Sequence, residues 1–342
     1  ITPDQLGDFF SPLGSVAELD EKYNFVTEKA FDGVVYGIPV VGNAQGIVYN
    51  KAVFEEAGIT ELPTTPEAFL EAMQMVKDNT DAVPYYTNYA AGWPLVQWQG
   101  NLGSFSCDPA VTSKLAYTDT PFGEGEAMYT MYKLMYDLVA NELVEEDPST
   151  TDWELSKELL GTGQVSAMVL GSWSIVQMQD AADDPADIGY MPFPSNNEES
   201  CAAAGGDWKM GVNVNSPNQL AARAWVDWFL NESGFAADQG GIPPLKGQPM
   251  PDTLAPFDEL GVQLIEAEPA PEGEEGWVDN IDAEAEVGLW APDFRQRIID
   301  AARGNTDETI DDIFADLNGR WTEARAEVVG DVDVEAEAPA EE

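Results

Sequence analysis

The reactions open to this chain are limited by a side chain that it lacks, because its 342 residues include no histidine. That absence excludes a Ser-His-Asp triad, a Cys-His pair and histidine-based zinc sites. An enzyme would have to use paired carboxylates or an activated lysine. The 63 acidic residues offer many carboxylate pairs, but none occupies a recognisable catalytic motif, so we predict a non-enzyme.

Thiols and nucleotide motifs are equally scarce. Cys107 and Cys201 are the only cysteines, so a four-cysteine zinc site is excluded, while a disulfide between them is left open. Neither a G-x-G-x-x-G nor a G-x-x-x-x-G-K-[ST] motif occurs. We therefore predict neither a metal nor a cofactor.

Tryptophan is the residue type here that best suits a ligand site, and the chain has ten. A flat indole can stack on the apolar face of a sugar ring, whose hydroxyl edge then needs a few placed polar groups. Four indoles lie outside clear helical patterns: Trp93, Trp98, Trp173 and Trp208. Asn43 could donate and accept hydrogen bonds and Asp207 could accept two, although a turn residue and a loop cap explain them nearly as well.

The segments that would position these side chains alternate between strands and helices. Short β-branched runs predict strands at 33–38, 45–49, 164–170 and 209–214, with the chain crossing between lobes at 39–43. Helices are expected from Thr65-Pro66, over 124–141, after a capping box at 216–219, and over 294–303 and 307–325, the last capped by Thr306. Trp225 and Trp228 are expected in the core. This order predicts α/β lobes with largely parallel pairing, and a loop-rich segment at 249–280.

Composition sets the class of protein and of partner. Acidic residues outnumber basic ones 63 to 15, and the formal charge of −48 disfavours nucleic acid and anionic membranes as partners. We interpret this charge as a solvated surface suited to high salt, in preference to a cation-binding role. An apolar fraction of 44% and the length predict a globular protein with two lobes. Residues 330–342 are predicted to be a disordered acidic tail.

Several sequence blocks, taken in order, carry a resemblance to a known family. They are 33–51 (GVVYGIPVVGNAQGIVYNK), 54–58 (FEEAG), 63–69 (PTTPEAF), 167–173 (AMVLGSW), 205–218 (GGDWKMGVNVNSPN) and 298–304 (IIDAARG) with the helix that follows. Through them the chain resembles family 1 extracellular solute-binding proteins, the maltose-binding-protein-like components of ABC sugar transporters.

The resemblance implies an α/β, two-lobe periplasmic-binding-protein type II fold with the ligand in the inter-lobe cleft. The implied division is 1–41 for part of lobe 1, 42–204 for lobe 2, 205–285 for lobe 1 again, and 286–329 for the last helices of lobe 2. Hinges are expected at Val41, Gly42, Gly205 and Gly206. Relatives carry a longer segment before the Tyr-Gly-Ile-Pro stretch, so a first lobe truncated at its N-terminus is expected.

The resemblance also implies a sugar site and its partners. Trp173 would stack on the sugar, Trp208 would assist, and Tyr89 with Trp93 would form an aromatic cluster, with Trp98 and Trp290 as further candidates beside Asn43 and Asp207. The implied function is capture of a mono- or oligosaccharide by an extracytoplasmic, monomeric protein, periplasmic or anchored as a lipoprotein, that delivers it to an ABC permease. The alternatives are the same fold binding a polyamine, peptide or metal complex, a glycoside hydrolase, and an adhesive surface protein.

Overall fold

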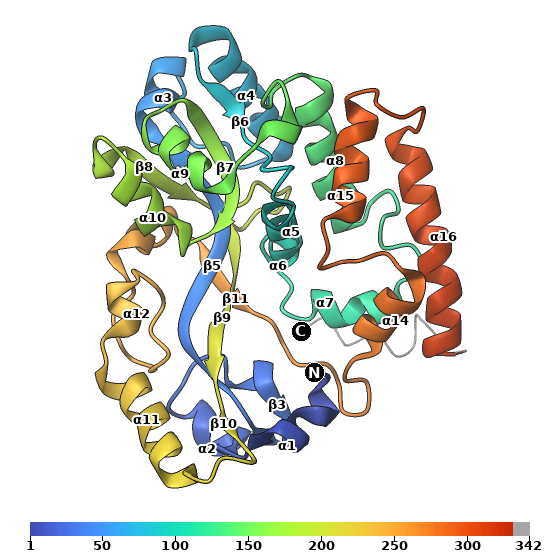
Figure 1. The fold of residues 1–342 in the computed structure, drawn as a ribbon. Helices are drawn as coiled ribbons and strands as arrows, with labels where there is room; N and C mark the ends of the chain where they lie inside the picture. Colours follow the sequence, from blue (N-terminus) through green and yellow to red (C-terminus); the bar gives the residue numbers. More distant parts are fainter. Residues whose placement is uncertain (331–342) are drawn as a thin grey trace.

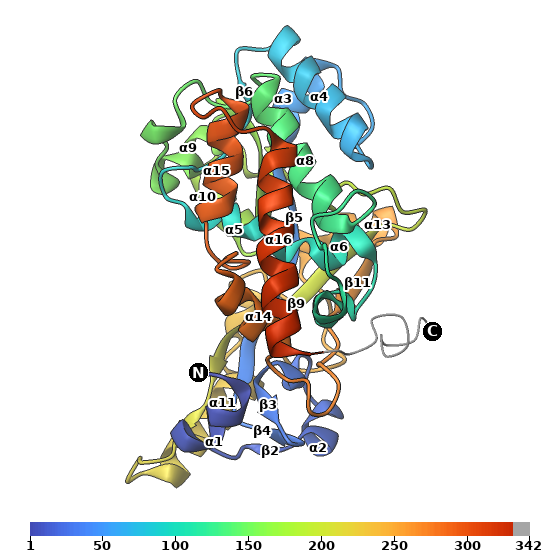
Figure 2. The ribbon, with the colours of Figure 1, turned by 90° about the vertical axis from the view of Figure 1, so that its right-hand side faces the viewer.

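The computed structural model describes residues 1–330, and the tail predicted from residue 330 lies, apart from Gly330, outside the described residues. Figure 1 shows a larger upper part and a smaller lower part, with two long strands running between them: β5 (Ile38–Asn50) and β9 (Cys201–Met210). The same separation is visible in the side view of Figure 2. The mixed α/β architecture agrees with the predicted fold class.

The main sheet is built around β5. Its strand order is β11-β9-β5-β7-β6, with β8 also paired to β5. The other strands are β6 (Val83–Tyr85), β7 (Val165–Gly171), β8 (Ile188–Met191) and β11 (Gln263–Glu266). In the described residues β5 is antiparallel to β7, β8 and β9, and only β6–β7 and β9–β11 are parallel.

The prediction of largely parallel pairing was therefore wrong. One 13-residue strand pairs with β9 through its first half and with β7 and β8 through its second half. The segment 39–43, where a crossing between lobes was predicted, lies within this strand as it runs from the lower to the upper part.

Alternate residues of the central strands face two different cores. Ile47 and Tyr49 of β5 belong to one apolar cluster, whereas Val48 between them belongs to another. This is the pattern of a sheet that is covered by helices on both faces. Figure 1 shows α9 (Trp153–Gly161) and α10 (Ser174–Ala181) on one side, and α8 (Ala127–Ala140), α15 (Asp293–Ala302) and α16 (Ile310–Val328) on the other.

Threonine side-chain caps set the first residues of two helices in the upper part. The Thr65 hydroxyl accepts a hydrogen bond from the Ala68 N–H at 3.2 Å, which confirms the predicted start of α4 (Pro66–Asn79). The cap of α16 is Thr309 and not Thr306, because Thr309 forms a capping box with Asp312. The remaining upper helices are α3 (Lys51–Ala57), α5 (Trp93–Gly100), α6 (Leu102–Ser106), α7 (Val111–Lys114), α13 (Ala255–Leu260) and α14 (Trp277–Ala285).

The lower part has its own core, which includes Val40 and Val41 from the other end of β5. It contains a small sheet of order β2-β4-β3 and a β1–β10 pair. Its elements are α1 (Leu6–Phe9), β1 (Phe10–Ser11), β2 (Gly14–Ser15), α2 (Val16–Asp20), β3 (Ala30–Phe31), β4 (Val34–Val35), β10 (Val212–Asn213), α11 (Gln219–Glu232) and α12 (Phe235–Asp238). The 3₁₀ turns are η1 (Pro3–Gln5), η2 (Val26–Lys29), η3 (Leu115–Tyr117), η4 (Pro148–Thr150), η5 (Pro185–Asp187) and η6 (Asp252–Leu254).

Helix α11 departs from its prediction in two ways. It begins at Gln219 with Asn218 as a cap that makes no side-chain hydrogen bond, so the expected box at 216–219 does not form. Trp225 and Trp228 are 56% and 44% exposed, because the helix buries the adjacent stripe that carries Val226 and Leu230.

The two ends of β5 lie in different cores, while the exact lobe boundaries stay a prediction. Ile281 and Ala285 of α14 pack in the same upper core as Trp321. Within residues 1–330, no helix combines the length and the apolar character that crossing a bilayer would demand.

Candidate ligand-binding site

A cavity of about 550 Å³ lies beside β9 where the upper and lower parts meet. Glu28 and Lys209 line it from the lower part, and Gln45, Gln99 and Trp290 line it from the upper part. Its volume lies in the range of roughly 300–1,000 Å³ typical of small-molecule sites. We call it the inter-lobe cavity.

Three indoles form a cluster near this cavity, which we call the aromatic patch: Trp93, Trp153 and Trp173. Their ring centroids are 4.8 Å apart for Trp93–Trp153, 5.8 Å for Trp93–Trp173 and 5.7 Å for Trp153–Trp173. Trp93 and Trp153 are the first residues of α5 and α9, and Trp173 follows the end of β7. Trp93 is 39% exposed and the other two are half-buried, so the patch keeps accessible ring surface.

Sequence reasoning brought Trp93 and Trp173 together as candidates but missed Trp153. The available signal was Asp152, which caps α9 by accepting a hydrogen bond from the Leu155 N–H at 2.8 Å. That cap fixes Trp153 at the helix end, where a side chain is less enclosed than in the middle turns.

Gly171 connects the aromatic patch to the inter-lobe cavity. A methyl group added at Gly171 would lie 2.6 Å from Trp173 Nε1 and 3.6 Å from Gln45 Nε2. The indole edge therefore rests on bare backbone next to Gln45, which lines the cavity. A similar close approach joins the Trp93 and Trp290 segments, because a methyl group at Gly92 would lie 3.2 Å from the Pro292 ring.

A chain of polar contacts crosses the sheet beside the patch. Ser172 Oγ donates to Asn43 Oδ1 at 3.4 Å, and Asn43 Nδ2 donates to Asp207 Oδ2 at 3.1 Å. Asn43 is buried, and these two hydrogen bonds engage both the oxygen and the nitrogen of its amide. The second Asp207 oxygen accepts from the Trp208 N–H at 2.8 Å.

Two predicted stacking residues lie elsewhere. Trp98 is a core residue, 1% exposed, because α5 turns it inward and its Nε1 donates to the Tyr85 hydroxyl at 2.9 Å. Its assignment to the ligand site is therefore corrected. Trp208 is 70% exposed, has a positive φ of 42°, and stacks on Phe235 of the lower part at 6.4 Å, apart from the aromatic patch.

Tyr89 and Trp290 differ in how much surface they offer. Tyr89 is half-buried and donates to Asp300 at 2.9 Å, and burial, followed by that hydrogen bond, raises the pKa of its phenol. Trp290 is 59% exposed and lines the inter-lobe cavity.

A buried guanidinium holds the loop that carries Trp290. Arg295 is fully buried and donates to the carbonyls of Leu289 at 2.8 Å and Ala291 at 2.5 Å, which flank Trp290. Burial lowers the pKa of Arg295, and the Tyr132 and Asp282 groups near it act in the opposite direction. Asp282 accepts from the N–H groups of Gly288 and Leu289, and burial raises the pKa of its carboxyl.

The predicted hinge residues lie opposite one another in the β5–β9 ladder, with Val41 paired to Asp207, Gly42 to Gly206 and Asn43 to Gly205. Packing explains two of the glycines, because a methyl group at Gly42 would lie 2.4 Å from Phe25 and one at Gly206 would lie 2.2 Å from Pro39. A hinge role for these four residues stays a prediction.

Carboxylates dominate the charged lining of the inter-lobe cavity, which comprises Glu28, Asp108, Lys209, Glu268, Glu274 and Asp279. Lys209 is itself paired with Glu28 at 2.6 Å. Such a lining disfavours an anionic ligand. Among residues 1–330 no cluster of three or more carboxylate or thiol side chains is arranged to hold a metal.

The chain is similar to known binding proteins over most of its length. Residues 3–234 match the model of a family described as bacterial extracellular solute-binding protein. The mannobiose complex of BlMnBP1, a binding protein of an ABC transporter from Bifidobacterium animalis subsp. lactis, is 39% identical with a TM-score of 0.91 over 96% of this chain and 79% of that one. The manno-oligosaccharide-specific BlMnBP2 of the same organism, in complex with mannotriose, gives 36% and 0.90 with the same coverage.

A curated relative extends the comparison to another sugar. The diacetylchitobiose binding protein DasA of Streptomyces coelicolor is 26% identical over 258 residues, which is 68% of this chain and 56% of that protein. The chain spans about half the length of the curated relatives it matches.

Proposed function

This chain belongs to the bacterial extracellular solute-binding protein family, and on that premise we propose that it is the sugar-binding component of an ABC importer. It binds an oligosaccharide without transforming it. The observation that carries the proposal is the aromatic patch of Trp93, Trp153 and Trp173, which adjoins an inter-lobe cavity of about 550 Å³ through Gly171 and Gln45. Indole faces beside a polar-lined cavity suit the two sides of a sugar ring.

The ligand we propose is a manno-oligosaccharide. Support comes from the likeness to the mannobiose and mannotriose complexes, at 39% and 36% identity over 96% of this chain. Trp173, Trp93 and Trp290 supply the stacking surfaces, and Asp207 is the polar candidate at the crossover, where the buried Asn43 amide holds it. An uncharged sugar also fits the acidic lining, which would repel a uronic acid.

Transport requires that the ligand change the shape of its receptor. A sugar that contacts both the upper and lower parts binds a closed state better than an open one, and only that difference shifts the population. The closed, monomeric protein would then dock on the permease. We place the protein outside the cytoplasm, in the periplasm or on a lipid anchor at the cell surface.

Isothermal titration calorimetry of the chain tests the proposal. Mannobiose and mannotriose should bind with saturable heats, whereas the disaccharide of a uronic acid should not. Small-angle scattering should show a smaller radius of gyration in the saturated protein. Absence of binding by every saccharide tested would contradict the function.

A cationic solute is the second candidate, because five of the six charged residues lining the inter-lobe cavity are acidic. Spermidine in the same titration separates the two candidates. Binding of spermidine, with no response to mannobiose, would replace the sugar proposal by a polyamine-binding function.

A further inference from the structure

Two glutamines line the inter-lobe cavity, and their hydrogen bonding differs. Gln99 is 4% exposed, and its Oε1 accepts from the Tyr132 hydroxyl at 2.7 Å and from Arg295 Nη2 at 3.1 Å. Gln45 is half-buried, and its Oε1 is buried with no hydrogen-bond partner within residues 1–330. Gln99 therefore belongs to a structural network, whereas Gln45 does not.

The position of Gln45 in the sheet makes its unpartnered Oε1 unfavourable for the stability of the free protein. It lies in the middle of β5, paired with Gly171 of β7, and a methyl group at Gly100 would lie 3.2 Å from its Oε1. A buried polar atom without a partner lowers stability, and native proteins retain few of them. An apolar side chain of the same length would suit the free protein better at this position.

The other end of this amide, Nε2, is not among the buried unpartnered atoms of residues 1–330, so it is the end that a ligand in the inter-lobe cavity can reach. We propose that Gln45 is a specificity-determining residue, whose amide hydrogen-bonds a hydroxyl of the bound saccharide at the edge of the Trp173 indole. This inference rests on the sugar-binding function proposed above.

The chemistry of the amide suits a hydroxyl ligand. The terminal torsion of glutamine is broad and roughly two-fold, so a half-turn presents either Oε1 or Nε2 to the cavity. A sugar hydroxyl both donates and accepts, and can therefore satisfy either orientation. Because Nε2 lies near Gly171, on which the Trp173 indole rests, the hydroxyl edge of a ring stacked on Trp173 falls within reach.

The test combines affinity with the stability of the free protein in Gln45→Met and Gln45→Leu. Removing a group that only the ligand satisfies should weaken mannobiose and mannotriose binding about tenfold. The same substitutions should raise the melting temperature of the ligand-free protein by about 2 °C. This pairing of weaker binding with higher stability distinguishes a ligand contact from a structural residue.

Gln99→Leu is the matched control on the same cavity wall. It leaves the Tyr132 hydroxyl without its acceptor and removes one of the acceptors of Arg295, so its melting temperature should fall. Unchanged affinity in both Gln45 variants, or a Gln45 variant that is less stable than the wild type or fails to fold, overturns the inference. Failure of the wild type to bind any saccharide overturns the proposed function instead, so the two failures are distinguishable.

Discussion

At the scale of single residues, Trp173 is suited to ligand stacking because its indole is fixed in place while part of its surface stays accessible. Its indole is fixed by Trp93, Trp153 and the backbone of Gly171, so little rotational freedom is left to lose when a ligand stacks on it. Preorganised aromatic side chains are the residues that most often dominate binding free energy.

Trp173→Ala should weaken mannobiose binding by about 1–3 kcal/mol, because it removes an aromatic anchor from the aromatic patch. The fold should remain intact, since the side chain is only half-buried. Titration calorimetry gives the affinity and circular dichroism checks the fold. Trp225→Ala is the control, since that tryptophan is 56% exposed on α11 and should leave affinity unchanged. Equal affinity of Trp173→Ala and wild type would remove Trp173 from the site.

At the scale of elements, the Trp290 loop depends on a residue of α15. Arg295 donates to the carbonyls on both sides of Trp290 and to Gln99 Oε1 at 3.1 Å. Arg295→Met would remove the side-chain donor from the Leu289 and Ala291 carbonyls and one of the two donors to Gln99 Oε1, so we expect a loss of about 2–4 kcal/mol in unfolding free energy. Urea unfolding measures this loss.

Sugar affinity should fall as well in Arg295→Met, because the loop is no longer fixed. Arg223→Met is the comparison, since within the described part of the chain the Arg223 guanidinium makes only an exposed pair with Asp227 on α11. A stability of Arg295→Met within about 0.5 kcal/mol of wild type would argue against this role.

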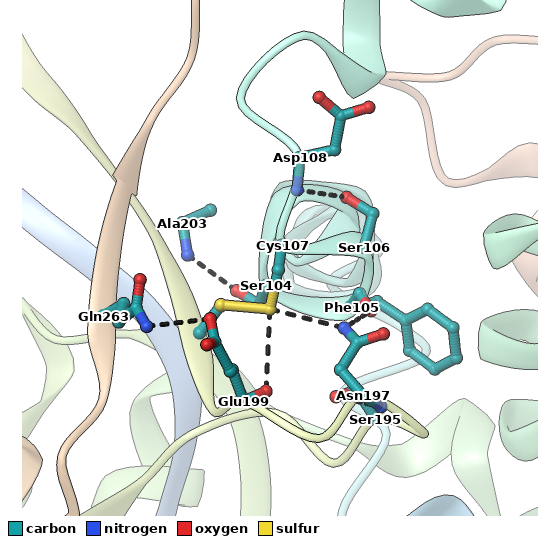
Figure 3. The surroundings of a disulfide bond; sticks show 11 residues. Ser104, Phe105, Ser106, Cys107, Asp108, Ser195, Asn197, Glu199, Ala203 and Gln263 are labelled. Atoms are coloured by element: carbon teal, nitrogen blue, oxygen red, sulfur yellow. Dashed lines mark hydrogen bonds between the residues drawn. A yellow bond between two sulfur atoms is a disulfide. The ribbon is translucent and has the colours of Figure 1, made fainter. Parts of the chain in front are cut away.

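The disulfide between Cys107 and Cys201 joins the end of α6 to the first residue of β9, and it settles the pairing that the sequence left open (Figure 3). Next to it, the Ala203 N–H donates to Ser104 Oγ at 2.8 Å. Gly103 and Ala203, from these two elements, line the inter-lobe cavity. The bridge therefore holds one wall of the cavity together.

Breaking the bridge should cost about 2–4 kcal/mol, because it closes a loop across 94 positions and restricts the unfolded chain. Urea unfolding of the wild type with and without reductant measures this difference. The double variant Cys107→Ala, Cys201→Ala should match the reduced wild type and show no response to reductant. Identical curves for oxidised and reduced wild type would contradict the prediction.

At the scale of the whole molecule, stability should increase as the pH falls from 7 towards 5. The chain has no histidine, so carboxyl groups are the side chains left to titrate in this range. Burial is the main cause that raises the pKa of Glu126, Glu145, Glu266 and Asp282. The folded protein then binds more protons than the unfolded chain between pH 4 and these raised values, so folding is favoured at lower pH and this gain is lost as the pH rises through them.

Thermal melts at pH 7, 6 and 5 check the prediction. Below about pH 4 the trend should reverse, because hydrogen bonds, chiefly to Arg297, lower the pKa of Glu308 and Asp316, and that contribution is lost on protonation. Glu145→Gln should flatten the rise between pH 7 and 5. A melting temperature that falls steadily from pH 7 to 5 would be the contrary result.

Local sequence chemistry determined much of the fold. The Thr65 cap, the helix predicted over 124–141 and the strand predicted at 164–170 depend on neighbours in the chain, and the structure contains them as the start of α4, as α8 and as β7. The absence of histidine and the ten tryptophans come from composition alone. They pointed towards a binding protein for a ligand with an apolar face.

Only the tertiary structure decided which of these side chains meet. Trp98 and Trp225 exchanged their expected environments, because periodicity shows that a helix has an apolar face and not which element covers it. Trp153 contacts Trp173, which lies 20 residues later in the chain, and also Trp93, which lies 60 residues earlier. Gln45 and Gln99 are the same residue type, and the sequence does not show that their hydrogen bonding differs. The difference arises because Arg295, distant along the chain, donates to Gln99 and not to Gln45.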